Sequence, residues 1–298
     1  MRKSALVAWV LRAAGRAWLL PARRGLCAPG PPQSILKKAK GCDALLPGAA
    51  AGGRLRLLGS GAQGRFQMKI IWLGHAGFRI EIGDQVLLVD PWLTNPLFPA
   101  ARRAEAIAGA TAILVSHGHS DHMADAVALS KELGIPVAGK YDLTSWLEKS
   151  EGLSGSIGFN NGGTIKLGSV NVTMVAASHS SSAMTENGPV YLGSEAGYMI
   201  EHGGRTIYFS GDTDVMADMA IFADLHNPEI GILSAGGHFT MDMKRAAYAC
   251  RKFFHFRTVI PCHYKTFPLL EQSADDLRAG VSHHINVIEP EVMVAIEL

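Results

Sequence analysis

The 298-residue sequence contains only four cysteines, and no two of them form a CxxC pair. Cys27 and Cys42 lie near the start of the chain, whereas Cys250 and Cys262 lie near its end. Cysteines that are this few and this widely spaced argue against a disulfide framework and against a cysteine-based zinc site. A reducing compartment therefore fits the composition, and we expect a cytoplasmic protein.

Long apolar runs are also missing. The longest apolar stretches near the N-terminus are interrupted by Arg12, Arg16 and Pro21. These stretches are too short and too charged to cross a bilayer. We therefore predict no membrane span.

Acidic residues are nearly missing from the first 67 residues, which contain 12 Lys and Arg but a single acid, Asp43. The rest of the chain contains 16 basic and 25 acidic residues, and a body with this charge does not attract nucleic-acid phosphate in bulk. Residues 1–67 are rich in Pro, Ala and Gly without a lasting hydrophobic period, so we expect a disordered leader. It is either a transit peptide for an organelle or upstream sequence translated from a misplaced start codon.

From Met68 onwards the chain has the pattern of one globular domain, residues 68–298. Hydrophobic residues make up 48% of the sequence and charged residues 18%, as in ordinary α/β proteins. Short apolar runs bounded by turn residues predict strands, and apolar residues at helical spacing predict helices. The predicted strands are 69–73, 78–82, 86–89, 113–116, 230–233 and 259–261, the predicted helices are 123–133, 141–149 and 243–254, residues 164–177 form one hairpin arm, and a hairpin joins 196–201 to 206–210.

The densest group of potential metal ligands follows the strand predicted at 113–116. His117, His119, Asp121 and His122 form an HxHxDH pattern. Neutral imidazole and carboxylate suit zinc and related divalent metals, and ligands spread along a loop can point to two centres. A solvated polar loop is the alternative, but three imidazoles and a carboxylate within six residues favour a metal site.

Three more candidate ligands also follow predicted strands. His179 comes after the arm 164–177, Asp212 after the second strand of the hairpin, and His263 after the strand 259–261. Short loops held by a rigid sheet are suited to positioning such groups. The sequence therefore predicts one metal centre with seven ligands.

In combination, these motifs resemble those of the metallo-β-lactamase superfamily, in which HxHxDH is followed by a His, a Gly-Asp-Thr-type Asp and a late His. The resemblance covers residues 68–298. It implies a four-layer αββα sandwich, with two β-sheets back to back, helices outside and the metals at one edge. It further implies that His117, His119 and His179 hold a first metal, that Asp121, His122 and His263 hold a second, and that Asp212 bridges them.

A narrower resemblance concerns residues 72–77, which contain His75, and residues 236–241, which contain His238. Both segments are similar to uncharacterised metal-dependent hydrolases related to ascorbate-6-phosphate lactonase. His75 and His238 are therefore candidates for contacts with the substrate or with metal ligands. A hydrogen-bonded structural histidine is the alternative for each.

The ligand set predicts a hydrolase that holds two divalent metal ions, either zinc or manganese. Two cations a few ångströms apart can share a bridging hydroxide and stabilise the oxyanion that forms when it attacks. We expect Asp121 and Asp212 to take part in catalysis, with Asp212 offering one carboxylate oxygen to each cation. The expected substrate is a small ester, lactone or phosphoester.

Several alternatives remain open at this point. A nucleic-acid phosphodiesterase would use the same metals but needs a basic groove, and the negative charge of residues 68–298 argues against it. A non-catalytic metal- or ligand-binding sensor would be favoured by a replaced ligand, and none of the seven is replaced. An iron-containing superfamily member that reduces oxygen or oxidises sulfur is compatible with the ligands. We expect a small-molecule partner and no nucleic acid, and a homo-oligomer is compatible with the sequence.

Overall fold

The computed structural model describes residues 68–298, and the predicted leader, residues 1–67, lies outside the described residues. The described chain forms two seven-stranded sheets and one two-stranded sheet. In spatial order, the first sheet contains β16 (Ala295–Glu297), β1 (Lys69–Trp72), β2 (Phe78–Ile82), β3 (Gln85–Val89), β4 (Ala112–Val115), β5 (Val137–Lys140) and β6 (Ser156–Phe159). The second contains β15 (Asn286–Val287), β14 (Thr258–Cys262), β13 (Ile230–Ser234), β12 (Arg205–Phe209), β11 (Ala196–His202), β8 (Val170–Ala176) and β7 (Thr164–Leu167), and the small sheet pairs β9 (Ser182–Thr185) with β10 (Gly188–Tyr191).

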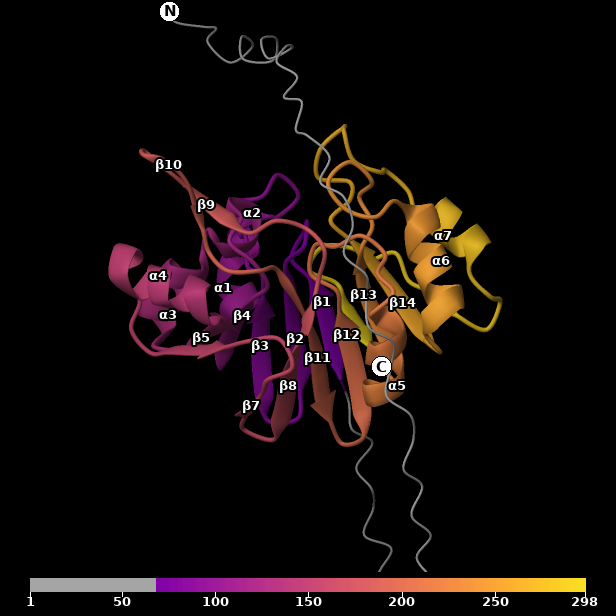
Figure 1. Cartoon of the computed structure of the whole chain (residues 1–298), viewed down its shortest axis with the longest axis horizontal. Helices are drawn as coiled ribbons and strands as arrows, with labels where there is room; N and C mark the ends of the chain where they lie inside the picture. The colour runs from indigo at the N-terminus through magenta and orange to yellow at the C-terminus, as the bar shows by residue number, and fades with distance from the viewer. Residues whose placement is uncertain (1–67) are drawn as a thin grey trace, which may run out of the picture. The chain divides into compact units, whose positions relative to one another are not determined.

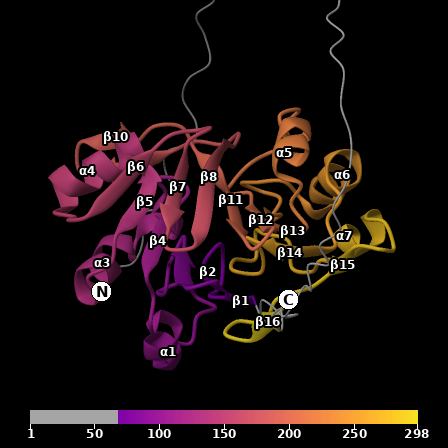
Figure 2. The same ribbon diagram turned by 90° about the horizontal axis from the view of Figure 1, so that it is seen from below.

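Helices cover the outer faces of the two large sheets. Helices α1, α3 and α4 lie on the side of the first sheet, and α5, α6 and α7 lie on the side of the second (Figure 1 and Figure 2). The helices are η1 (Ala100–Arg102), α1 (Arg103–Ile107), α2 (Ser120–Met123), α3 (Ala126–Leu133), α4 (Tyr141–Glu151), α5 (Met219–His226), α6 (Met243–Phe253) and α7 (Asp275–Gly280). This αββα order confirms the predicted four-layer sandwich. Within residues 68–298, none of the helices has the length and apolar character needed to cross a membrane.

Both faces of the central strands are buried, which explains why their sequences are continuously apolar. In β3, Leu87 and Val89 belong to the core shared by the two sheets, whereas Leu88 belongs to the core that contains residues of α1, α3 and α4. In β4, Leu114 faces the shared core and Ile113 the helices. Strands covered on both faces lose the alternation of polar and apolar residues that marks a half-exposed strand.

Most predicted strands and the hairpin at 196–210 are confirmed. Gly203 and Gly204 connect β11 to β12, and their φ angles of +60° and +77° are those of a tight turn that glycine adopts without strain. The single arm predicted at 164–177 is wrong, because Gly168 (φ +53°) turns the chain between β7 and β8. The helix predicted at 123–133 is confirmed over 126–133 as α3, but it begins later than predicted, because the chain breaks at Asp125 between α2 and α3. The Asp125 carboxylate accepts a hydrogen bond from the Leu93 backbone N–H.

Candidate metal centre

Three histidines from both large sheets form the first group of potential ligands. His117 and His119 lie between β4 and α2, whereas His179 follows β8 of the second sheet. One ring nitrogen of each lies within 4.8 Å of the others. His117 is fully buried, and His117 Nε2 lies 3.0 Å from His119 Nδ1. The first predicted ligand set is therefore brought together.

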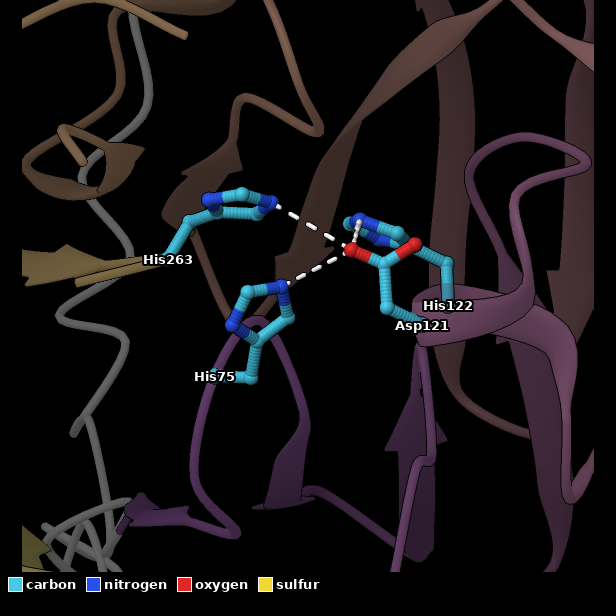
Figure 3. Close-up of side chains that lie close together, drawn as sticks. All are labelled: His75, Asp121, His122 and His263. Atoms are coloured by element: carbon cyan, nitrogen blue, oxygen red, sulfur yellow. Dashed lines mark hydrogen bonds and ion pairs between the residues drawn. The ribbon is translucent and has the colours of Figure 1, made fainter. Parts of the chain in front are cut away.

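The second group contains a residue that the predicted second ligand set did not include. His75, Asp121, His122 and His263 each offer one atom within 4.8 Å of the others. Asp121 Oδ2 lies 2.9 Å from His75 Nε2, 3.6 Å from His263 Nε2 and 3.7 Å from His122 Nε2. Figure 3 shows the three imidazoles converging on this carboxylate. His75 lies between β1 and β2, and Asp121 and His122 lie in α2.

Asp212 lies between the two groups. Its Oδ2 atom is 3.7 Å from His179 Nε2 in the first group, and 3.3 Å and 3.0 Å from the Nε2 atoms of His122 and His263 in the second. Its Oδ1 atom accepts a hydrogen bond of 3.0 Å from the Ser234 hydroxyl. The two oxygens are therefore not equivalent: Oδ2 approaches imidazoles of both groups, whereas Oδ1 is bound by the Ser234 hydroxyl.

Asp90 is a buried residue of the centre that sequence reasoning missed. It follows β3, and its Oδ2 atom lies 2.8 Å from His122 Nδ1. The Ser116 hydroxyl donates to the same oxygen at 2.5 Å and lies 2.9 Å from His117 Nδ1. If both Nδ1 atoms carry the proton, the Nε2 lone pairs of His117 and His122 point into the centre. The only sequence signal for this role was an acid placed directly after an apolar strand.

Backbone strain is concentrated at the centre. His75, Asp90 and His263 have φ angles of +51°, +45° and +58°, a left-handed region that residues other than glycine rarely occupy. The His263 backbone N–H donates to the His75 carbonyl at 2.9 Å, which joins the two strained segments. A Cβ atom on Gly236 would lie 2.0 Å from the His263 carbonyl oxygen, so only glycine allows this approach.

The carboxylates stabilise the charged forms of His122 and His263, whereas burial lowers the pKa of His75, in the same group, to about 4. Burial by itself lowers the pKa of His263, but Asp212 and Asp121 outweigh burial and raise this pKa to about 9. Burial likewise opposes the raised pKa of His122, which Asp212, Asp121 and Asp90 hold well above its ordinary value. Burial raises the pKa of Asp212, but His263 and His122 outweigh it and hold that pKa well below its usual range. The buried Asp212 carboxylate therefore requires positive charge beside it.

The first group behaves differently because none of its members is a carboxylate. Burial is the largest effect on each ring, and it lowers the pKa values of His117, His119 and His179. These imidazoles are therefore held in the neutral form, which is the form that binds a metal.

The donor atoms of both groups fit divalent cations. His122 Nε2 is buried and has no hydrogen-bond partner in residues 68–298, although Asp212 Oδ2 lies 3.3 Å away. His75 Nδ1 lies 2.8 Å from the Thr266 hydroxyl, which can itself donate to the Tyr264 carbonyl at 3.2 Å. Because an ionised carboxylate only accepts, His75 Nε2–H donates to Asp121 Oδ2 at 2.9 Å. The other tautomer, with the proton on Nδ1, would offer Nε2 to a cation. Imidazole nitrogens and carboxylate oxygens gathered in this way match the ligands of zinc and manganese.

His238 lies apart from these groups. It is exposed and packs edge-on against Phe239, with ring centroids 4.6 Å apart. It lines a cavity of about 440 Å³ together with Ser178, Asp214 and Arg245. Of the two additional histidines singled out in the sequence, the structure brings His75 to the ligands and leaves His238 outside them.

Known proteins share both the sequence and the fold. The family model described as Beta-lactamase superfamily domain matches residues 85–264, which include all seven predicted ligands. A UPF0173 metal-dependent hydrolase of Cereibacter sphaeroides is 65% identical over 232 residues, which cover 78% of this chain and 100% of that protein.

Solved structures agree with this assignment. The metallo hydrolase Igni18 from Ignicoccus hospitalis has a TM-score of 0.68 and 26% sequence identity, covering 78% of this chain and 98% of that one. The metallo-beta-lactamase fold protein YhfI from Bacillus subtilis has a TM-score of 0.59 and 18% identity, covering 78% of this chain and 100% of that one. The chain therefore belongs to the metallo-β-lactamase superfamily, among the metal-dependent hydrolases that its relatives represent.

Proposed function

We propose that the chain holds two divalent cations and hydrolyses a small ester, lactone or phosphoester. The observation that carries this proposal is the position of Asp212 Oδ2, within 3.7 Å of imidazole nitrogens from both ligand groups. The first cation would be held by His117, His119 and His179, the second by Asp121, His122, His263 and also His75, and Asp212 would be shared. Zinc suits this donor set, and manganese is the alternative.

Two cations at these positions would lower the pKa of a water molecule toward neutrality and stabilise negative charge on the substrate. The protein's own residues hold and orient the donors. Asp90 fixes the ring of His122, and Ser234 holds Oδ1 of Asp212 so that Oδ2 faces the imidazoles. Burial keeps bulk water away from Asp212, whose side chain is 2% exposed.

Asp121 is the more accessible of the two carboxylates at the centre. Its side chain is 30% exposed and lines a cavity, whereas that of Asp212 is enclosed. In ester hydrolysis the oxygen of water bonds to the carbonyl carbon, the ester C–O bond breaks, and a proton of the water passes to the departing oxygen. We assign the transfer of that proton to the Asp121 carboxylate.

The proposal is tested by measuring metal content and turnover on the full chain. Mass spectrometry after native purification should find two divalent metals per chain. A panel of lactones, phosphodiesters and thioesters, supplied to the zinc-loaded and manganese-loaded protein, should identify hydrolysis. One metal per chain after saturation would contradict the dinuclear centre. Native iron with visible absorption would contradict simple hydrolysis.

A further inference from the structure

A cavity of about 460 Å³ adjoins the candidate metal centre. His119 and Asp121 form part of its wall, so a molecule in the cavity lies beside both ligand groups. The volume is in the range of pockets that enclose small molecules. The cavity is therefore positioned to hold the part of a substrate that is attached to the reacting bond.

Apolar side chains from three elements make up much of the remaining wall. Val127 comes from α3, Trp146 and Leu147 from α4, and Ala183 and Met184 from β9. Met184 is 78% exposed, so part of this apolar surface is open to whatever enters. Transfer of apolar groups from water to such a surface is favourable.

The wall also lacks positive charge. Within the described residues, its lining contains no Lys or Arg, and its acids are Asp121 and Glu151. Lys131 lies beside Glu151, but its ammonium group donates to the Glu151 carbonyl at 2.7 Å and is not part of the lining. A phosphate or carboxylate bound in the part of this cavity away from the metal centre would lose hydration without meeting a Lys or Arg of the wall.

From these observations we infer that the cavity binds an uncharged apolar group, the acyl or aryl part of an ester or thioester. The inference rests on the proposed hydrolytic function and narrows its substrate class. It disfavours substrates whose group beside the scissile bond ends in an anion, including phosphorylated sugar lactones.

The second cavity offers a contrasting environment. It is lined by Ser178, Asp214, Asp242 and Arg245, and none of the seven predicted ligands belongs to its described lining. Arg245 is engaged by Asp214 through two contacts of 2.6 Å. An anionic group that entered this cavity would compete with Asp214 for Arg245, so the two cavities differ in the charge that their walls offer.

The test compares matched p-nitrophenyl esters on the zinc-loaded full chain. The acetate, butyrate, hexanoate and octanoate esters lengthen the apolar group, and the adipate monoester carries a carboxylate at the end of a hexanoyl-length chain. We expect kcat/KM to rise by up to about fourfold for each buried methylene, and the adipate monoester to react at least about tenfold more slowly than the hexanoate. Equal rates along the series, or faster reaction of the adipate, would overturn the inference and leave the hydrolase proposal standing.

A variant that introduces a positive charge tests whether this cavity causes the slower reaction of the adipate monoester. Met184→Lys places a cation at the exposed rim, and the ratio of hexanoate to adipate kcat/KM should fall at least about fivefold. Tyr248→Lys is the matched control, because Tyr248 is also an exposed apolar side chain and lies on α6 outside this lining. The inference is wrong if Met184→Lys and Tyr248→Lys behave alike.

A binding measurement covers the case in which no ester is hydrolysed. Octanamide, which is uncharged, should displace water from Trp146 and shift its fluorescence emission to shorter wavelength, and Trp146→Phe should remove this shift. Octanamide binding by a protein that hydrolyses no ester would support the inference of an apolar binding cavity and contradict the hydrolase proposal. Failure of octanamide to bind would reject the apolar cavity.

Discussion

The two large sheets have the same order of strand pairings, although their sequences show no repeat that we could detect. From β16 to β6 the first sheet has three antiparallel pairings followed by three parallel ones, and from β7 to β15 the second sheet has the same series. The first parallel pair of each sheet, β3 with β4 and β12 with β13, also shares a hydrogen bond at the ends of the strands. The backbone N–H of Ser116 donates to Asp90 Oδ1, and that of Ser234 donates to Ser210 Oγ at the corresponding position.

The sheets differ in the ligands that they contribute. The first supplies His75 and the HxHxDH residues, whereas the second supplies His179, Asp212 and His263. Neither ligand group is complete within one sheet, because His179 joins the first group and His263 joins the second. The candidate metal centre therefore forms only when the two sheets pack together. Each prediction below removes or changes a residue that one of the sheets contributes.

The largest effect is expected from Asp212→Ala, because Asp212 Oδ2 is the atom that faces both groups. The variant should lower metal occupancy at both positions, and turnover should fall by about a thousandfold, since several kcal/mol of charge stabilisation is lost. Metal per chain by mass spectrometry and turnover of the best panel substrate provide the measurements. Two tightly held metals and near-normal turnover in Asp212→Asn would show that the residue does not bridge.

A second prediction separates the two groups by removing one ligand from each. His117→Ala should mainly empty the first position, and His263→Ala should mainly empty the second, so each variant should retain about one metal per chain. His255→Ala, which removes an exposed histidine, should retain two. Cobalt substitution gives a spectroscopic measurement of the remaining site. Loss of the same metal from both ligand variants would refute the division into two groups.

A smaller effect is expected from Asp90→Asn, which acts through His122. Both Asp90 oxygens accept, Oδ1 from the Ser116 backbone N–H and Oδ2 from Ser116 Oγ and His122 Nδ1. The NH2 group of asparagine would have to face the donors on one side, so the hydrogen bonds that fix the His122 ring are weakened. Affinity at the second position should fall about tenfold to a hundredfold, with the first position little changed, as measured by competition with a chelating dye. Asp276→Asn, on an exposed acid of α7, is the control. Equal losses at both positions would show that Asp90 supports the fold in general.

The smallest predicted effect is a dependence of metal-free stability on pH. The pKa of His263 is raised to about 9 in the folded protein, so its stabilising contribution is complete below an unfolded pKa of about 6.5 and is lost as the pH rises through 9. The melting temperature of metal-free protein should fall by about 5 °C between pH 6.5 and 9.5. This difference should shrink in His263→Asn and in the metal-loaded protein. A metal-free protein that is equally stable at both pH values would contradict the charge pairing.

Much of the fold could be predicted because it depends on local patterns. The prediction of 78–82 as a strand matches β2 in both bounds, and the hairpin around Gly203 and Gly204 was recognised from its turn residues. In contrast, β5 was missed because its sequence, Val-Ala-Gly-Lys, contains three residues that are depleted in strands. Its Lys140 is nevertheless buried, and its ammonium group donates to Asn161 Oδ1. Packing between neighbouring parallel strands outweighed local preference there.

The sequence by itself determined the ligand types, because HxHxDH and the three later residues after strands carry their chemistry in their side chains. Their roles as metal ligands stay predictions until metals are measured. Only the tertiary structure decided that His75 joins Asp121, that Asp90 orients His122, and that a single oxygen of Asp212 faces both groups. These relations join residues that lie far apart along the chain, as the hydrogen bond from His263 N–H to the His75 carbonyl illustrates. Local sequence fixes which groups are available, whereas the distances between them depend on how the two sheets pack together.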